Sequence, residues 1–515
     1  MTVRSAEPAG EPTRRIEIDT ARILGRDQAH YGVIDIGSNS IRLVVYDSLS
    51  RAPFPRFNEK SFSALGAGLD ASGNLTDEAI RRAIHAIRRL DAIAKAMDVP
   101  RIDVIATEAT RRAKNGTKLV EAIREATGME TRVLTGEEEA TYTSMGVISG
   151  FFRPVGLVGD IGGGSLEVAE VVDDKVGERM TSMPLGALPV KALMEEGYGT
   201  AKDAIDEILR ENIPPLLTNP VFYAVGGGWR ALARVHIAMN AAPISVVHGY
   251  EVEAEELRKL ARKIAKMDRA EVADLPDVPS RRVDTLPAAA LVMSRVLKAL
   301  KPESVVFSSY GLREGWLYAQ LDEEEQYRDP LLECAQAIGL PGARVPAFSA
   351  ALAKWTDDLF PGETDSDRRL RLSVCALTDL SWRDHDKVRA EESFLRLLQF
   401  PFIGISHAER AFLAVAIMAR YGGKAETVTD RLGGLLSQSQ LRRAEILGRA
   451  LVLGHRFSAS VPEILLQSRL RVEAGSVRLE VLDAESVPDS EAVQTRLRQL
   501  AKAMGVSDSE VVEAA

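Results

Sequence analysis

Strand-like and helix-like patterns of hydrophobic residues follow one another from residue 31 to about residue 321. Residues 33–46 are predicted to form two hydrophobic strands joined by a short polar turn. Thr76 stands where it can cap a helix, and hydrophobic residues recur in that helix at i, i+4 and i+7. These residues are Ile80, Ile84 and Ile87. A buried strand is predicted at 104–106. Because strands alternate with helices, the pattern predicts an α/β fold.

The polar turn of the first two strands recurs later in the chain. The run Asp160-Ile-Gly-Gly-Gly-Ser-Leu-Glu167 aligns with Asp35-Ile-Gly-Ser-Asn-Ser, at an offset of 125 residues (160 minus 35). The residues of the two turns are Gly37, Ser38, Asn39 and Ser40, then Gly162, Gly163, Gly164 and Ser165. Two such hairpins predict a duplicated α/β domain, with the functional site in the cleft between its halves.

Beyond residue 321 the strand pattern largely stops. Residues 330–468 are mostly helical in pattern, 469–482 alternate around Gly475 as a hairpin, and 491–504 are predicted to form a helix. We therefore divide the chain into five parts. These are a disordered tail (1–30), two α/β domains (31–150 and 151–321), a helical domain (322–468) and a small α+β domain (469–515).

Composition and charge exclude several classes of protein. With 515 residues, of which 45% are apolar and 27% charged, the chain can build several buried cores. Its net charge of −9 argues against a nucleic-acid-binding protein. The two cysteines, Cys334 and Cys375, form no Cys-x-x-Cys motif and fit a reducing cytoplasm. No apolar segment approaches the roughly 20 residues that span a bilayer, and residues 1–30 lack the apolar core of a signal peptide. We expect a cytoplasmic protein with no nucleic-acid or membrane partner.

Turns rich in Gly, Ser and Asn can direct successive N–H groups and hydroxyls at one point and so bind an anion. One such turn is usually an ordinary hairpin turn. Two copies facing across a cleft, each preceded by an aspartate, favour a phosphoanhydride site in which Asp35 and Asp160 hold a hydrated Mg²⁺. A third glycine turn, at 226–228, is explained nearly as well by helix packing.

Three glutamates open the helix predicted after Thr135. Glu138 stands at capping-box spacing from Thr135, and acidic residues in general favour the first turn of a helix. Glu139 has no such capping role. Arg111, with the neighbouring basic residues, is on composition alone a solvated surface group.

Together with three further motifs, these features resemble the exopolyphosphatase and guanosine pentaphosphate phosphohydrolase (Ppx/GppA) family in both order and spacing. The further motifs are Ala106-Thr-Glu-Ala-Thr-Arg111, Gly136-Glu-Glu-Glu139-Ala and Ser309-Tyr-Gly-Leu-Arg-Glu-Gly315. The resemblance covers about residues 31–321. It implies duplicated ribonuclease H-like domains of the actin-like ATPase kind, in the sugar kinase, heat-shock protein 70 and actin superfamily.

The resemblance also implies a chemistry. Family members remove terminal phosphate from inorganic polyphosphate, or the 5′-γ-phosphate of guanosine pentaphosphate (pppGpp), by Mg²⁺-assisted water attack. Glu139 would be the general base, Glu167 a second essential carboxylate serving metal or water, and Arg111 a clamp on the phosphoryl group. Asp35, Asp160 and Glu167 would hold metal, and both turns with Gly227 would bind phosphate. A homodimer is expected.

The motifs leave several functions open. The leading hypothesis is an exopolyphosphatase, and the pppGpp phosphohydrolase of the stringent response is its alternative within the same class. An actin-like or sugar-kinase ATPase fits less well. Kinases usually need a second carboxylate base aimed at a substrate hydroxyl and a clear adenosine pocket, whereas the Ser-Asn-Ser turn and the Glu139-Ala pattern fit phosphohydrolysis better. A non-catalytic sensor would need a broken site, whereas all the expected site residues are present.

The C-terminal half adds two observations. In longer family members the resemblance implies an HD-like helical domain, but the matching helix reads Leu377-Thr378-Asp379 and lacks the histidine, so we expect no working metal site. Between residues 431 and 471 there are seven arginines and two acids. Arg442, Arg449 and Arg456 are seven residues apart and would form one stripe on a helix. This stripe is either a track for polyphosphate or a solvated, ion-paired helix face.

Overall fold

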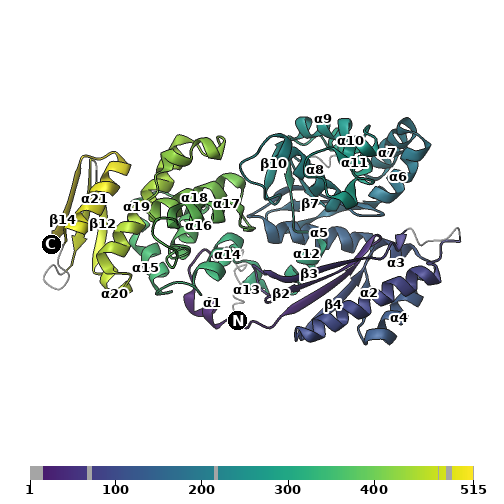
Figure 1. Cartoon of the computed structure of the whole chain (residues 1–515), viewed down its shortest axis with the longest axis horizontal. Helices are drawn as coiled ribbons and strands as arrows, with labels where there is room; N and C mark the ends of the chain where they lie inside the picture. Colours follow the sequence, from purple (N-terminus) through teal and green to yellow (C-terminus); the bar gives the residue numbers. More distant parts are fainter. Residues whose placement is uncertain (1–14, 67–71, 214–218, 474, 483–489, 514–515) are drawn as a thin grey trace, which may run out of the picture.

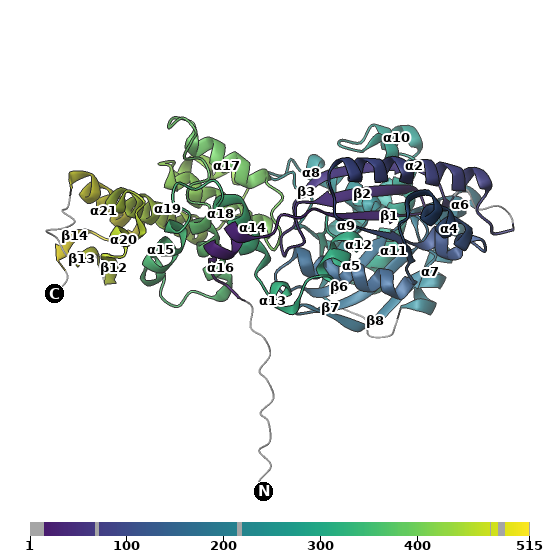
Figure 2. The ribbon, with the colours of Figure 1, turned by 90° about the horizontal axis from the view of Figure 1, so that it is seen from below.

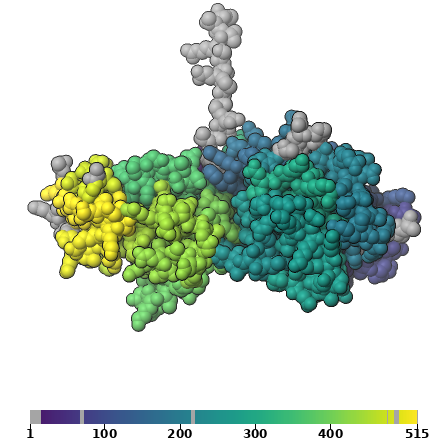
Figure 3. Space-filling view, turned by 90° about the horizontal axis from the view of Figure 1, so that it is seen from above, coloured from purple at the N-terminus to yellow at the C-terminus, as the bar shows by residue number. Residues whose placement is uncertain are grey.

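The computed structural model describes residues 15–66, 72–213, 219–473, 475–482 and 490–513. The molecule is elongated: two α/β halves form one end, a helical region the middle, and the C-terminal unit the other end (Figure 1). Figure 3 shows the same succession of units as a continuous surface. In the described part of the chain, no helix has the length and apolar character needed to cross a membrane.

The first half is built on a five-stranded sheet with the order β3-β2-β1-β4-β5. Strands β1 to β3 are antiparallel neighbours, and β1, β4 and β5 run parallel. Thr76 caps the helix that covers one face, as its sequence predicted. The elements are β1 (Tyr31–Ile36), β2 (Ser40–Tyr46), β3 (Pro55–Phe62), α2 (Asp77–Ala96), β4 (Arg101–Ala106), α3 (Glu108–Arg112), α4 (Gly116–Thr127), β5 (Thr131–Val133) and α5 (Gly136–Gly150).

The second half repeats this arrangement. Its sheet has the order β10-β11-β9-β6-β7-β8, in which β8-β7-β6-β9-β11 corresponds to the five strands of the first sheet. The strands are β6 (Val155–Ile161), β7 (Leu166–Val172), β8 (Lys175–Met183), β9 (Val221–Val225), β10 (Tyr250–Glu253) and β11 (Ser304–Phe307). The helices are α6 (Ala187–Glu196), α7 (Tyr198–Asn212), α8 (Gly227–Met239), α9 (Ala254–Ile264), α10 (Arg269–Ala273), α11 (Leu286–Leu300) and α12 (Leu312–Tyr318). The duplication predicted from the two hairpins is therefore present.

Two helices exchange places between the halves. Helix α5 ends the first half in sequence but packs on the second sheet, where Val147 and Ile148 meet Val158. Helix α12 ends the second half but packs on the first sheet through Trp316 and Leu317. The boundary predicted between residues 150 and 151 separates the two halves along the chain. In the folded structure, however, each half contributes one helix to the sheet of the other.

The crossing of α5 and α12 depends on two glycines. A Cβ atom at Gly315 would lie 1.6 Å from the carbonyl oxygen of Tyr142, and one at Gly146 would lie 2.2 Å from that of Gly311. Because neither position has room for a side chain, the helices approach closely and form a layer between the two sheets (Figure 1).

The C-terminal half is helical and ends in a small sheet. Its helices are α13 (Glu323–Gln326), α14 (Pro330–Gly339), α15 (Phe348–Trp355), α16 (Asp365–Ala376), α17 (Arg389–Gln399), α18 (His407–Arg420), α19 (Gln438–Ser458), α20 (Pro462–Leu465) and α21 (Glu491–Met504). A three-stranded sheet has the order β12-β13-β14. Its strands are β12 (Ser468–Glu473), β13 (Ser476–Val481) and β14 (Asp508–Glu513).

The small C-terminal unit does not have a core of its own. Leu470 and Leu479 from its sheet and Leu497 from α21 belong to the same hydrophobic cluster as Leu352 and Trp355 of the helical region. The predicted hairpin around Gly475 is present, whereas β14 was not predicted. The domain boundary expected at residue 469 therefore marks a change from helices to strands, while both sides of it share one hydrophobic core.

The prediction of a disordered tail is wrong for residues 15–30, and residues 1–14 lie outside the described residues. Helix α1 (Thr20–Gly25) lies beside α14 (Figure 2). It is capped by Asp19, and Arg15 forms a β-bridge with Arg328. The sequence pattern missed this order because the segment is mainly polar, and its contacts come from distant residues.

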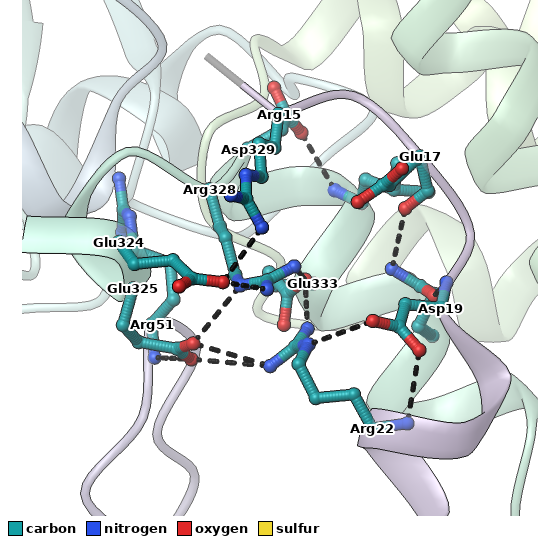
Figure 4. Close-up of polar contacts among 12 residues, drawn as sticks. Arg15, Glu17, Asp19, Arg22, Arg51, Glu324, Glu325, Arg328, Asp329 and Glu333 are labelled. Carbon is teal, nitrogen blue, oxygen red and sulfur yellow. Dashed lines mark hydrogen bonds and ion pairs between the residues drawn. The ribbon is translucent and has the colours of Figure 1, made fainter. Parts of the chain in front are cut away.

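Ion pairs hold this segment against the start of the helical region (Figure 4). Arg22 pairs with Glu325 at 3.3 Å and also with Glu333. Arg26 pairs with the same Glu333 at 2.9 Å. The Glu333 side chain is only 3% exposed, so its charge depends on these arginines for compensation. The N-terminal segment therefore stabilises the connection between the α/β pair and the helical region through ion pairs to Glu325 and Glu333.

Candidate active site

The two polar turns face each other, as the duplication predicted. Ser38 of the first turn lies against Gly163 of the second, where a Cβ atom would be 3.0 Å from the Ser38 Cβ. The Ser38 hydroxyl donates to the Glu108 carboxylate at 2.9 Å, and a Cβ atom at Gly164 would lie 2.0 Å from the same carboxylate. Glycine is therefore required where the two halves approach one another.

One aspartate stands at the base of each turn. In the strand register, Asp35 lies opposite Arg42 and Asp160 lies opposite Glu167. Asp35 accepts a hydrogen bond from Arg313 at 3.0 Å. Burial raises the pKa of Asp35, and the positive charges of Arg313 and Arg42 partly offset this effect.

Asp160 is held from the central helix layer. The Thr143 hydroxyl of α5 donates to its carboxylate at 3.0 Å. Burial raises the pKa of Asp160 and the negative charge of Asp35 raises it further, while Thr143 and Arg230 act in the opposite direction. The site therefore holds two half-buried carboxylates whose charges are only partly compensated.

Glu139 lies in the first turn of α5, which begins with the predicted capping box between Thr135 and Glu138. Glu138 therefore has a structural role, while Glu139 is buried and pairs with Arg111. Burial raises the pKa of Glu139 to about 7, although the Arg111 charge counteracts the increase. A carboxylate with this pKa can accept a proton at neutral pH.

Glu167 is the second carboxylate that the sequence indicated. It accepts a hydrogen bond from Ser182 at 2.9 Å. Burial raises its pKa well above the ordinary value, and the charges of Glu139 and Asp160 add to this effect. Because Glu139 and Glu167 influence each other, their protons belong to a coupled pair.

The structure brings nearly all the predicted cleft residues around one cavity of about 210 Å³. Those lining it are Asp35, Gly37, Ser38, Asn39, Ser40, Glu139, Asp160, Gly162, Gly163, Gly164, Ser165, Glu167 and Gly227. Arg111 is not in the lining. Its guanidinium instead contacts Glu139 and the Leu134 carbonyl, so in this structure it positions the carboxylate rather than facing the space for a phosphoryl group.

Five basic residues that also line this cavity were missed. They are Arg42, Lys60, Arg230, Arg282 and Arg313. A signal existed for two of them: Arg42 occupies the position in the first hairpin that Glu167 occupies in the second, and Arg313 lies within the quoted motif ending at Gly315. The other three come from a third strand, a helix start and a loop, and only the fold gathers them.

The third glycine turn contributes in a different way. Gly226 adopts a φ of +101°, and a Cβ atom there would lie 2.9 Å from Asp160. At Gly227 a Cβ atom would lie 2.1 Å from the Arg282 guanidinium. The turn therefore lets the start of α8 and Arg282 come close to the cavity.

Among the described residues, no three His, Cys, Asp or Glu side chains are grouped so that they could hold a metal ion by themselves. The expected trio of Asp35, Asp160 and Glu167 is thus not a preformed cage. Mg²⁺ needs only one or two carboxylates, because it keeps water ligands and takes phosphate oxygens. Two half-buried, partly uncompensated aspartates beside one cavity fit such an ion.

The arginine stripe is not the open track that we considered. Arg442 donates to the carbonyls of Ala503 and Met504 at the C-terminal end of α21. Arg449 donates to the Gly423 carbonyl at 2.9 Å and pairs with Glu445. Both arginines therefore make contacts within the C-terminal half, and Arg449 is ion-paired, as the alternative interpretation expected.

The duplicated sheets and the carboxylate-lined cleft define an actin-like phosphatase fold. The chain belongs to the Ppx/GppA phosphatase family, whose model matches residues 44–324. A model described as "Exopolyphosphatase, C-terminal" matches residues 331–511, which includes both the helical region and the small sheet. The chain is accordingly a hydrolase of this family.

Three relatives with different names are similar in sequence to parts of this chain. Exopolyphosphatase 1 of Mycobacterium tuberculosis is 31% identical over 310 residues, which are 57% of this chain and 88% of that protein. Retrograde regulation protein 2 of Saccharomyces cerevisiae is 26% identical over 91% of this chain and 85% of its own. A guanosine-5'-triphosphate,3'-diphosphate pyrophosphatase of Photobacterium profundum is 23% identical over 84% and 90%.

A solved structure supports the fold of the α/β pair. The crystal structure of an exopolyphosphatase from Cytophaga hutchinsonii is similar with a TM-score of 0.51 and 23% identity, and covers 56% of this chain and 97% of that one. Because the identity is low, this similarity concerns the fold.

Proposed function

We propose that this hydrolase is an exopolyphosphatase that removes terminal phosphate from inorganic polyphosphate by water attack, with Mg²⁺ as its cofactor. The observation that carries the proposal is a second cavity of about 870 Å³, which shares part of its lining with the catalytic cavity and extends to Phe54 and Pro401. A chain of phosphates needs such an extension, whereas a single phosphoryl group does not.

The extended cavity is strongly basic. Its basic side chains are Arg42, Lys60, Arg230, Arg234, Arg281, Arg282 and Arg313, and its acidic ones are Asp277 and Glu314. Burial lowers the pKa of Lys60 to about 8, and the charges of Arg282 and Arg281 contribute to the decrease. Burial and the charge of Arg313 lower the pKa of Arg230 to about 10. The cations repel one another, so a polyanion in this cavity would relieve the repulsion.

In the proposed mechanism, Glu139 accepts a proton from the attacking water, and Arg111 keeps its carboxylate oriented. The turn N–H groups and the basic side chains compensate the charge of the phosphoryl oxygens. Asp35 and Asp160 are the residues that would hold Mg²⁺, which would supply charge compensation for the phosphate oxygens. Glu167, beside Glu139, would hold the water through a hydrogen bond.

The direct test of the mechanism is Glu139→Gln, assayed with polyphosphate and Mg²⁺. We expect binding to survive and hydrolysis to fall by orders of magnitude, since removal of a general base typically costs 10²–10⁴-fold. Chelation of Mg²⁺ with EDTA should abolish turnover of the parent enzyme. Turnover by the variant at the parent rate would remove Glu139 from the role of base.

The substrate is tested through two residues that line only the extended cavity. Arg234 and Arg281 are exposed and do not line the catalytic cavity. Replacing both with Gln should raise KM for long-chain polyphosphate about tenfold, with a much smaller effect on tripolyphosphate. The control is Arg124→Gln with Arg262→Gln, an equal charge change at exposed positions outside both cavities. An equal effect on both substrates would contradict the proposed path.

The second candidate substrate is pppGpp. It is favoured by the relative from Photobacterium profundum that is named for this activity, which covers 84% of this chain. A comparison of kcat/KM for phosphate release from pppGpp and from polyphosphate decides between the two. A higher value for pppGpp would reverse our ranking.

A further inference from the structure

The helical region contains a separate cavity of about 730 Å³. It lies between the end of α18, helix α19 and helix α21 of the C-terminal unit, and shares no lining residue with either cavity of the cleft. Five arginines from five different segments converge on it. They are Arg344, Arg389, Arg420, Arg456 and Arg496.

The acidic groups around this cavity compensate only part of the positive charge. Asp386 lies in the lining but is exposed. Asp379, which is buried behind the lining, pairs with Arg344 at 2.7 Å and lies 3.8 Å from Arg420. Five positive charges thus face two negative ones, which leaves a local excess.

Two of the arginines are available for a ligand. Arg456 is exposed, and among the described residues it has no hydrogen bond or ion pair. Arg496 is half-buried, and its contact is with the neutral Gln499 at 2.8 Å. Arg456 is also the one member of the predicted stripe that faces a cavity.

The interior of the cavity is unfavourable for further positive charge. Burial lowers the pKa of Arg420 to about 10, and the charges of Arg344 and Arg389 contribute. Burial lowers the pKa of His455 well below its ordinary value, and Arg420 and Arg344 lower it further, so this histidine is neutral at pH 7. Convergent guanidinium groups in a concave site are the arrangement that binds phosphate oxygens in pairs.

We propose that this cavity is a second ligand site that binds a triphosphate group, separate from the catalytic cleft. Its size is within the usual range for a small-molecule site and exceeds what a single phosphate needs. A bound triphosphate would contact Arg420 and Arg456 of the helical region and Arg496 of the C-terminal unit together. The group can come from a nucleoside triphosphate or from the end of a polyphosphate chain.

The test measures binding of inorganic tripolyphosphate by calorimetry to the full-length chain carrying Glu139→Gln, which slows hydrolysis. We expect two binding events per chain. Adding Arg456→Gln and Arg496→Gln should weaken one event at least tenfold and leave the other unchanged. The matched control adds Arg469→Gln and Arg498→Gln, which are exposed, neighbouring arginines outside the cavity, and should retain both events.

The outcomes separate the proposal from its alternatives and from the proposed function. A single binding event in the parent that the cavity variant leaves unchanged, or two unchanged events in the cavity variant, would overturn the second site. If only the binding event of the helical cavity is observed, the result would count against the proposed site in the cleft and not against the second site. Repeating the titration with GTP identifies the source: tighter binding of GTP than of tripolyphosphate points to a nucleotide, and weaker binding to a polyphosphate end.

Discussion

Replacing Glu139 with Gln is expected to stabilise the metal-free protein at alkaline pH while it inactivates the enzyme. The carboxylate is buried, and its pKa of about 7 lies above the ordinary value of 4.5. A carboxylate with a raised pKa favours the folded state when protonated and opposes it when ionised. The stability that protonated Glu139 contributes to the folded state is therefore fully present below pH 4.5 and is lost as the pH rises through about 7.

The size of the effect follows from the difference between the two pKa values. Each pKa unit corresponds to about 1.4 kcal/mol, so the ionised Glu139 costs the native state about 3 kcal/mol at pH 8. At pH 5 the cost is about 1 kcal/mol or less by the same relation. Gln has a similar shape and no charge, so the variant should regain this energy.

The assay is calorimetric melting of parent and variant in EDTA at pH 5 and pH 8. The variant should melt several degrees above the parent at pH 8 and close to it at pH 5. The control is Glu138→Gln, which changes the adjacent, more exposed glutamate. Hydrogen bonds from Thr135 and Arg132 lower the pKa of Glu138. Replacing the Glu138 carboxylate should therefore lower the melting temperature slightly. Equal melting of parent and Glu139→Gln at both pH values would refute the argument.

Three further predictions concern activity and the joints between parts of the fold. Because only the ionised Glu139 accepts a proton, kcat/KM for polyphosphate should fall about tenfold from pH 8 to pH 6 for a pKa of about 7; a flat pH profile would contradict this. Glu333→Gln removes the buried carboxylate that Arg22 and Arg26 share, although both keep Glu325 as a partner, and should cost about 1–3 kcal/mol, seen as faster proteolysis within residues 15–30. The exposed Glu324→Gln should have little effect there. Gly315→Ala introduces a Cβ at 1.6 Å from a backbone oxygen and should lower the melting temperature and the activity together. Gly199→Ala, where no atom lies within 4 Å of the new Cβ, should be close to neutral.

Local sequence patterns predicted the elements of the site well. The capping box before Glu139 and the two hairpin turns are local features, because caps and turns depend on residues three or four positions apart. The repeat at an offset of 125 residues then indicated that the turns face one another. These signals were sufficient to bring Asp35, Asp160 and the turn residues to one cleft, and the family resemblance added Glu139.

Local patterns were misleading where long side chains find partners far away. The stripe of Arg442, Arg449 and Arg456 has the predicted helical spacing, but spacing alone does not show what each guanidinium contacts. Two of the three donate to backbone carbonyls at or just beyond the C-terminal ends of other helices. The family resemblance assigned Arg111 to the phosphoryl group, and in the structure its guanidinium pairs with Glu139.

The sequence by itself determined the duplicated fold, the carboxylates and glycine turns of the cleft, and the family, because these depend on residue types at short, repeated spacings. Only the tertiary structure decided where the positive charge lies. The basic residues of the extended cavity come from two strands, two helices and the short turn at 280–282, and those of the helical cavity come from five segments. A net charge of −9 hides both clusters, because electrostatic attraction depends on distances in space, which are set when distant segments pack together.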